Sequence, residues 1–205
     1  MPRIGSASLN NIKYWNGVYS HQEYPTRGDN NRVRYEAAAS MQAGMSALDV
    51  GCGQAGLGRV LLGQQPDHFF YLGCDFSDAA VRSHVLPEGR DGQWHLVVCD
   101  WREIGAFGQF ETVYLCEMLE HVEEPAQLLA LAVEAARLRI VITVPRYQKL
   151  SWAEHRGEHA WDFTLEELAQ LAKPYGRISE PTAASKLCWA MNITLGEANA
   201  CSVSA

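Results

Sequence analysis

Five apolar runs of strand length recur along the chain, and they limit its possible folds more than any other feature. The runs are continuous rather than alternating, which is typical of strands buried on both faces of a parallel sheet. Helix-like segments lie between them, so the pattern predicts an α/β fold with a doubly wound, mostly parallel sheet and helices on both faces. The runs occupy residues 45–50, 69–74, 94–99, 110–116 and 139–144.

Local signals mark where helices begin and how the sheet ends. Ser77 is an expected N-cap, Pro125 an expected first helical residue, and Thr164 with Glu167 has the spacing of a capping box. A helix is also expected from Asn31, whereas the segment between the third and fourth runs is the weakest helix of the series. The last two β-like runs have no obvious crossover helix between them, so we expect them to close the sheet as an antiparallel hairpin.

Composition indicates a single globular domain. The chain has 205 residues, of which 47% are hydrophobic, and a formal net charge of -7. This charge argues against a large phosphate-binding surface, so nucleic acid is an unlikely partner. No window approaches the ~20 apolar residues of a membrane span, and we expect a cytoplasmic protein without membrane contact. The six cysteines form no CxxC pair, which favours reduced thiols.

A glycine-rich loop follows the first strand-like run. Gly51, Gly53 and Gly56 form a GxGxxG pattern between an expected strand and an expected helix. Glycine permits positive φ and lets a ligand approach the backbone, while a helix N-terminus offers free N–H groups. The loop therefore predicts a nucleotide-like ligand, and NAD and S-adenosylmethionine remain alternatives at this point.

Two acidic residues further along the chain distinguish between these ligands. Asp75 ends the second run, where a carboxylate can accept both hydroxyl groups of a ribose. Asp100 follows the third run, where a carboxylate suits an adenine amino group and Trp101 offers a stacking face. Asp100 is the third acidic residue near a strand end, after Asp49 and Asp75. A third such residue favours S-adenosylmethionine over NAD as the ligand.

These motifs together resemble those of class I S-adenosylmethionine-dependent methyltransferases. DVGCG matches the family's glycine motif, CDFS its ribose motif and CDW its adenine motif, and CEMLEHV and TVPR match later motifs. The resemblance covers residues from about 45 to 195 and implies a seven-stranded sheet with a reversed last strand. It also implies cofactor-binding roles for Tyr14, Trp15, Asp49, Gly51, Cys52, Gly53, Asp75, Phe76, Asp100, Trp101 and Cys116.

The resemblance also divides the single domain of residues 1–205 into parts. We expect an N-terminal arm and helix over the cofactor at residues 1–43, a cofactor-binding half at 44–145 and an acceptor-side half at 146–205. A monomer or homodimer is expected.

Candidate catalytic residues gather in two places. Glu117, Glu120 and His121 have the spacing i, i+3, i+4, which on a helix would put them on one face after the fourth strand. The later loop supplies His155 and His159 near aromatic residues. We expect His121, His155, His159 and Glu117 to provide catalysis, with a histidine assisting deprotonation of the acceptor, and assign no metal.

The leading hypothesis is methyl transfer to an oxygen, less readily a nitrogen, of a small molecule or saccharide. One alternative comes from a further resemblance, to the metal site of small-RNA 3′-terminal 2′-O-methyltransferases, in which two glutamates and two histidines hold a divalent ion. It implies Glu117, Glu120, His121 and either His155 or His159 as ligands. A non-catalytic adenosine-ligand-binding protein of the same fold is a third hypothesis, and NAD-dependent redox chemistry ranks last.

Overall fold

The computed structural model describes residues 10–20, 29–87, 89–90, 92–146, 158–179, 182–185 and 188–196. Within these ranges, no helix has both the length and the apolar character that crossing a membrane requires. The five cysteines in the same ranges are free thiols, as the sequence predicts; the sixth, Cys201, lies outside them.

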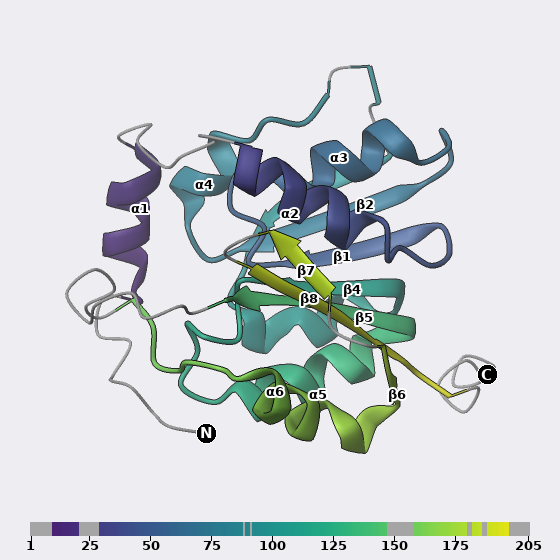
Figure 1. The fold of residues 1–205 in the computed structure, drawn as a ribbon. Helices are drawn as coiled ribbons and strands as arrows, with labels where there is room; N and C mark the ends of the chain where they lie inside the picture. The colour runs from purple at the N-terminus through teal and green to yellow at the C-terminus, as the bar shows by residue number, and fades with distance from the viewer. Residues whose placement is uncertain are drawn as a thin grey trace.

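A mixed sheet forms the centre of the fold (Figure 1). Its strands are β1 (Ser46–Val50), β2 (Phe70–Asp75), β3 (Trp94–Val98), β4 (Phe110–Cys116), β5 (Ala136–Pro145), β6 (Arg177–Ile178), β7 (Thr182–Ser185) and β8 (Cys188–Thr194). The order along the sheet is β3-β2-β1-β4-β5-β8-β6, and β7 also pairs with β8. Neighbouring strands from β3 to β5 are parallel, which confirms the doubly wound arrangement.

The reversed strand is β8, which lies antiparallel to β5. Its other edge pairs with β6 near Thr194 and with β7 near Cys188, both antiparallel. β6 and β7 thus share one position at the border, so eight strands fill seven positions in the sheet. This arrangement confirms the seven-stranded fold and the antiparallel pairing of the last two runs.

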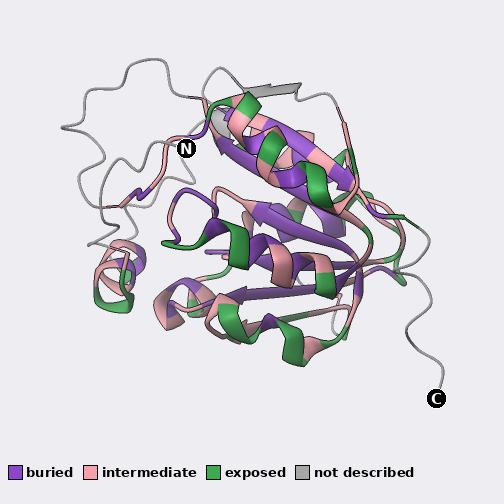
Figure 2. Ribbon diagram, turned by 90° about the horizontal axis from the view of Figure 1, so that it is seen from below, coloured by how far each residue is buried: buried purple, intermediate pink, exposed green. Residues whose placement is uncertain are grey.

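Helices cover both faces of the sheet. They are α1 (Ile12–Ser20), α2 (Asp29–Ala39), α3 (Gly56–Gln64), α4 (Asp78–Arg82), α5 (Pro125–Ala135) and α6 (Leu165–Ala172), with two 3-10 helices, η1 (Trp101–Phe107) and η2 (Lys173–Tyr175). Alternate strand residues point to opposite faces. Ala47 and Tyr71 therefore pack with α2 and α3, while Leu48 and Leu72 pack with α5 and α6. Figure 2 shows the central strands buried between helices whose outer sides are exposed.

Most local predictions are confirmed. The Ser77 hydroxyl accepts a hydrogen bond from the Ala80 amide at the start of α4, and Pro125 begins α5. Thr164 and Glu167 form the expected capping box of α6. The weakest expected helix is the 3-10 helix η1, and its glycine, Gly105, lowers its propensity for a regular α-helix.

Candidate active site

A pocket opens at the carboxyl ends of β1, β2 and β4, where the strand order of a doubly wound sheet reverses. Twelve of the fifteen predicted site residues line it: Trp15, Asp49, Gly51, Cys52, Gly53, Asp75, Phe76, Asp100, Trp101, Cys116, Glu117 and His121. Tyr14 and His159 are not among its lining residues. His155 lies outside the described residues.

The glycine loop turns tightly at the entrance to α3. Gly51 and Gly53 have φ angles of 73° and 53°, a region that side chains disfavour. The amides of Gly51 and Cys52 donate to the Cys74 carbonyl at 2.8 and 3.0 Å, which ties the loop to β2. A Cβ at Gly53 would lie 2.7 Å from the Tyr19 hydroxyl oxygen. The loop therefore has no side chain at Gly51 and Gly53, where its backbone borders the pocket.

Asp75 is fixed beside this loop. Its two carboxylate oxygens accept hydrogen bonds from the amides of Gly53 at 2.9 Å and Ser77 at 2.8 Å. Burial raises the pKa of Asp75, and these two amide hydrogen bonds oppose the increase. Each carboxylate oxygen has further lone pairs, so the group can still accept hydrogen bonds from a ligand that enters the pocket.

Asp49 lies beneath the loop and is almost fully buried. The Tyr71 hydroxyl donates a hydrogen bond to it at 2.8 Å. Burial raises the pKa of Asp49 to about 7; the Tyr71 hydrogen bond lowers it and the negative charge of Asp75 raises it further. A ligand cation near Asp49 would stabilise its ionised form.

Asp100 and Trp101 border the pocket at the start of η1. The Asp100 carboxylate accepts from the Arg102 amide at 2.9 Å and pairs with the Arg102 guanidinium at 3.1 Å. That guanidinium lies 4.3 Å from the centre of the Trp101 ring. Adenine recognition by these residues stays a prediction.

The expected helix over residues 117–121 is wrong. The chain forms a turn there, with Glu117 at a φ of 53°. This backbone directs Glu117 away from Glu120 and toward α2, where its carboxylate pairs with Arg34 at 3.1 Å and accepts from the Thr143 hydroxyl at 3.1 Å. The i, i+3, i+4 spacing thus brings two of the three residues together rather than all three.

Arg34 is a pocket residue that the sequence reasoning missed. Its side chain is 15% exposed, and its Nε is buried without a hydrogen-bond partner among the described residues. Nothing in the local pattern distinguishes this arginine from others on helix surfaces. Only the packing of α2 beside β5 and β8 shows that it faces the pocket.

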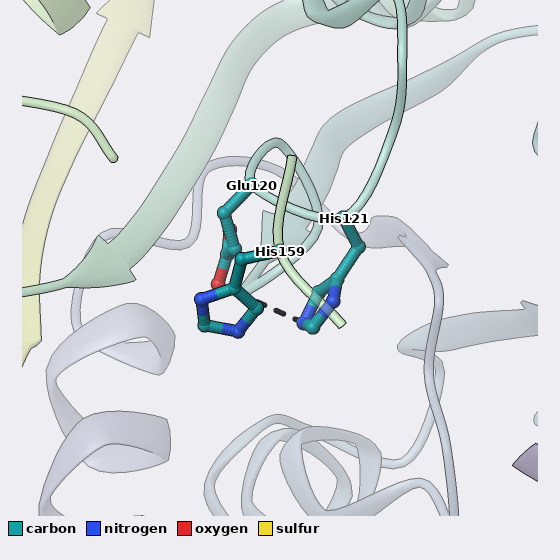
Figure 3. Close-up of side chains that lie close together, drawn as sticks. All are labelled: Glu120, His121 and His159. Atoms are coloured by element: carbon teal, nitrogen blue, oxygen red, sulfur yellow. Dashed lines mark ion pairs between the residues drawn. The ribbon is translucent and has the colours of Figure 1, made fainter. Parts of the chain in front are cut away.

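Glu120, His121 and His159 form a compact cluster (Figure 3), with one possible ligand atom from each lying within 4.8 Å of the others. Glu120 is buried, and neither of its carboxyl oxygens has a hydrogen-bond partner in the described part of the chain. Burial raises the pKa of Glu120 well above its usual value, with a further contribution from Glu117. The two imidazole rings lie 4.5 Å apart, centre to centre.

The position of His121 is fixed by the segment that carries His159. Its Nδ1 lies 2.9 Å from the Glu158 carbonyl oxygen. A carbonyl only accepts hydrogen bonds, so this contact assigns the proton of the neutral ring to Nδ1. Nε2 is then the basic nitrogen, and it lies 3.9 Å from a Glu120 oxygen. Such a nitrogen can take a proton or bind a metal ion.

Comparison with known proteins identifies similar sequences. Residues 48–138 match the model of a methyltransferase domain. A ubiquinone biosynthesis O-methyltransferase from Thiobacillus denitrificans is 32% identical over 102 residues, which are 48% of this chain and 43% of that protein. The chain thus spans less than half the length of this curated relative.

Solved structures share the fold. The SAM-bound magnesium protoporphyrin IX methyltransferase of Synechocystis matches with a TM-score of 0.73 and 15% identity, covering 96% of this chain and 100% of that one. The N-methyltransferase NodS of Bradyrhizobium japonicum, in complex with S-adenosylhomocysteine, matches with a TM-score of 0.72 and 13% identity over 92% and 100%. The matched domain, the strand order and these solved structures show that the chain has the fold of S-adenosylmethionine-dependent methyltransferases.

Proposed function

We propose that the protein transfers the methyl group of S-adenosylmethionine to an oxygen atom of a small molecule or saccharide. The observation that carries the proposal is the position of His121, which lines the same pocket as the glycine loop and Asp75. Methyl transfer from a sulfonium is an in-line displacement, so the protein must align acceptor and donor and exclude water. An oxygen acceptor also benefits from a base.

The pocket residues divide these tasks. Asp75 accepts hydrogen bonds from the ribose hydroxyls, and Asp49 faces the positively charged methionine end. Arg34, the buried cation of the pocket, attracts the methionine carboxylate. Nε2 of His121 takes the proton of the acceptor hydroxyl as the methyl group is transferred, while the Glu158 carbonyl holds the ring through Nδ1. Similarity to a ubiquinone biosynthesis O-methyltransferase supports oxygen as the acceptor atom.

Cofactor binding is tested by titrating S-adenosylhomocysteine into the wild type and Asp75→Asn. The substitution is isosteric but removes the charge that accepts from two ribose hydroxyls, so we expect a loss of affinity of about 2 kcal/mol. Asp100→Asn is the matched comparison at the adenine side. Equal affinity of Asp75→Asn and wild type would remove Asp75 from the cofactor site.

Methyl transfer is tested with phenols, catechols and saccharides as acceptors, with product mass as the readout. His121→Gln is expected to lower kcat by ~10² to 10⁴-fold at saturating cofactor, which is the usual contribution of a general base. Tight binding of S-adenosylhomocysteine without turnover of any acceptor would instead favour a binding protein of this fold.

Metal-dependent methyl transfer is the second candidate, because a buried carboxyl group that has no hydrogen-bond partner among the described residues lies beside two imidazoles. The donors of Glu120, His121 and His159 fit a divalent transition metal, since imidazole suits zinc and a carboxylate suits manganese. Glu117 is not part of this set because it pairs with Arg34. A bound ion would act as a Lewis acid toward the acceptor oxygen.

Titration of MnCl₂ and ZnCl₂ into the metal-stripped protein tests this candidate. We expect saturable one-site binding that raises the thermal midpoint of the wild type but not that of Glu120→Gln or His159→Asn. An oligoribonucleotide with a free 3′-terminal ribose then tests RNA as acceptor. Equal responses of wild type and Glu120→Gln to both metals would exclude a metal site in this cluster.

A further inference from the structure

Helix α1 makes hydrogen bonds at two separate places around the pocket. At the ribose side, the Asn16 side-chain oxygen accepts from the Ser77 hydroxyl at 2.6 Å, and its nitrogen donates to the Asp78 carboxylate at 2.7 Å. The Ser77 amide in turn donates to Asp75. Asn16 is therefore connected through Ser77 to Asp75, the carboxylate that we assign to the ribose.

The other contacts of the N-terminal segment converge on His121. The Asn10 side-chain nitrogen donates to the His121 carbonyl at 2.5 Å, while the Asn10 oxygen accepts from the Trp15 indole at 2.7 Å. The Trp15 ring meets the His121 ring edge-on, with 5.5 Å between centres. The Tyr14 hydroxyl donates to the Glu158 carboxylate, and Glu158 holds His121 Nδ1 through its own carbonyl.

These contacts fix His121 from three sides. Its carbonyl is held by Asn10, its ring edge by Trp15 and its Nδ1 by Glu158. The segments involved are far apart in sequence, 111 positions for Asn10 and His121 and 144 for Tyr14 and Glu158. Local chain stiffness therefore cannot hold the ring in this orientation, and the Glu158 carbonyl and the docked helix hold it together.

The docking of α1 is separable from the folding of the sheet. Trp15 and Tyr19 pack with Ala80 of α4 in a small cluster of their own, apart from the two large clusters on the faces of the sheet. Figure 1 shows α1 beside α4 at the edge of the molecule. An element with few apolar contacts opens at low free energy. A ligand that touches both α1 and the core would stabilise the docked state.

We propose that α1 is a clamp that couples cofactor binding to the orientation of His121, with Asn10 as its positioning residue. Asn10, Trp15 and Tyr19 line the pocket together with Asp75, so a bound cofactor buries them and favours the docked helix. The docked helix then holds the ring with its proton on Nδ1 and its basic nitrogen on the acceptor side. The inference rests on the proposed function for the chemical role of His121.

The substitution Asn10→Asp tests the clamp most sharply. Aspartate keeps the size of asparagine and can still accept from the Trp15 indole, but it cannot donate to the His121 carbonyl. Tyr14→Phe removes the second connection, to Glu158. Lys13→Ala changes an exposed residue of the same helix and is the matched control.

The readout is the pair of ring nitrogens of His121 in a long-range ¹H–¹⁵N spectrum, recorded with EDTA and saturating S-adenosylhomocysteine. In the wild type and Lys13→Ala we expect the shifts of a neutral ring protonated on Nδ1. In Asn10→Asp and Tyr14→Phe we expect shifts averaged between the two tautomers. Wild-type ring shifts in both variants would overturn the proposal.

Amide exchange provides a second measurement on the native protein. S-adenosylhomocysteine should slow exchange in both α1 and the 118–121 turn of the wild type, but in Asn10→Asp it should no longer slow exchange in the turn. Slowing that is the same in both proteins would overturn the coupling. Neither measurement requires methyl transfer, so a protein that binds the cofactor without turnover would contradict the proposed function and leave the clamp standing.

Discussion

The Tyr71 hydroxyl donates its hydrogen bond to Asp49 across the neighbouring strands β1 and β2, at 2.8 Å and in the buried interior. Among the described residues, this hydrogen bond opposes the effect of burial on Asp49, whose pKa is raised to about 7. The folded protein therefore binds the proton of the Asp49 carboxyl group more tightly than the unfolded chain does. The stabilisation from this protonation is complete below about pH 4 and is lost as pH rises to about 7.

Asp49→Asn should therefore change the pH dependence of stability. The amide can still accept from Tyr71 but carries no charge, so we expect the free energy of unfolding at pH 8 to rise by about 2 kcal/mol and its decline between pH 4 and 7 to flatten. Urea unfolding at pH 5 and pH 8 measures both effects. Tyr71→Phe should do the reverse and steepen the decline; identical pH profiles for wild type and Asp49→Asn would contradict the assignment.

Gly53→Ala should damage the glycine loop. At a φ of 53° the new Cβ would lie 2.7 Å from the Tyr19 hydroxyl oxygen, so we expect a cost of about 1 to 2 kcal/mol in unfolding free energy from strain at this φ and weaker binding of S-adenosylhomocysteine. Gly63→Ala is the control, because it lies in α3 with no atom within 4 Å of the new Cβ. There we expect a gain of about 0.5 to 1 kcal/mol. Equal effects of the two substitutions would show that loop geometry is irrelevant.

Arg34 and Glu117 should behave as one unit. Their side chains are 15% and 20% exposed, so removing one partner leaves a largely desolvated charge. We expect Arg34→Met to cost about 2 to 3 kcal/mol and the double variant with Glu117→Gln to cost less than the sum of the single variants. Chemical denaturation of the four proteins measures the coupling. Strict additivity would mean that the ion pair contributes nothing.

The two N-caps should differ in their effect on α1. Ser77→Ala and Thr164→Ala each remove a side-chain cap, so each should cost about 1 kcal/mol. Only Ser77 also donates to Asn16, so only Ser77→Ala should increase cleavage within α1 under limited proteolysis. Digestion of both variants, followed by mass spectrometry of the fragments, distinguishes them; equal cleavage rates would show that Ser77 does not hold α1.

The sheet could be predicted because its signals are local. Each buried strand is a continuous apolar run, and Gly51 and Gly53 occur where the loop needs positive φ. The same holds for the caps at Ser77 and Thr164, whose side chains bond amides only three residues away.

The chemical end of the site could be predicted only in part. The spacing of Glu117, Glu120 and His121 is compatible with a helix. In the structure these residues form a turn, and Glu117 pairs with Arg34 on α2. The grouping of His121 with His159 depends on a loop far along the chain. Tertiary packing determines which of these residues contact one another, and a short-range sequence pattern does not show it. The roles of the individual residues and the division at residues 43 and 145 stay predictions.

The border of the sheet beyond β8 has a consequence for self-association. A long, flat outer strand would offer another copy of the chain a row of open amide and carbonyl groups. Here the outer edge consists of two short strands, β6 with two residues and β7 with four, which pair with different parts of β8. Because this edge is short and interrupted, a strand from another molecule could form few backbone hydrogen bonds with it in any one register. The edge formed by β6 and β7 should therefore resist fibril growth.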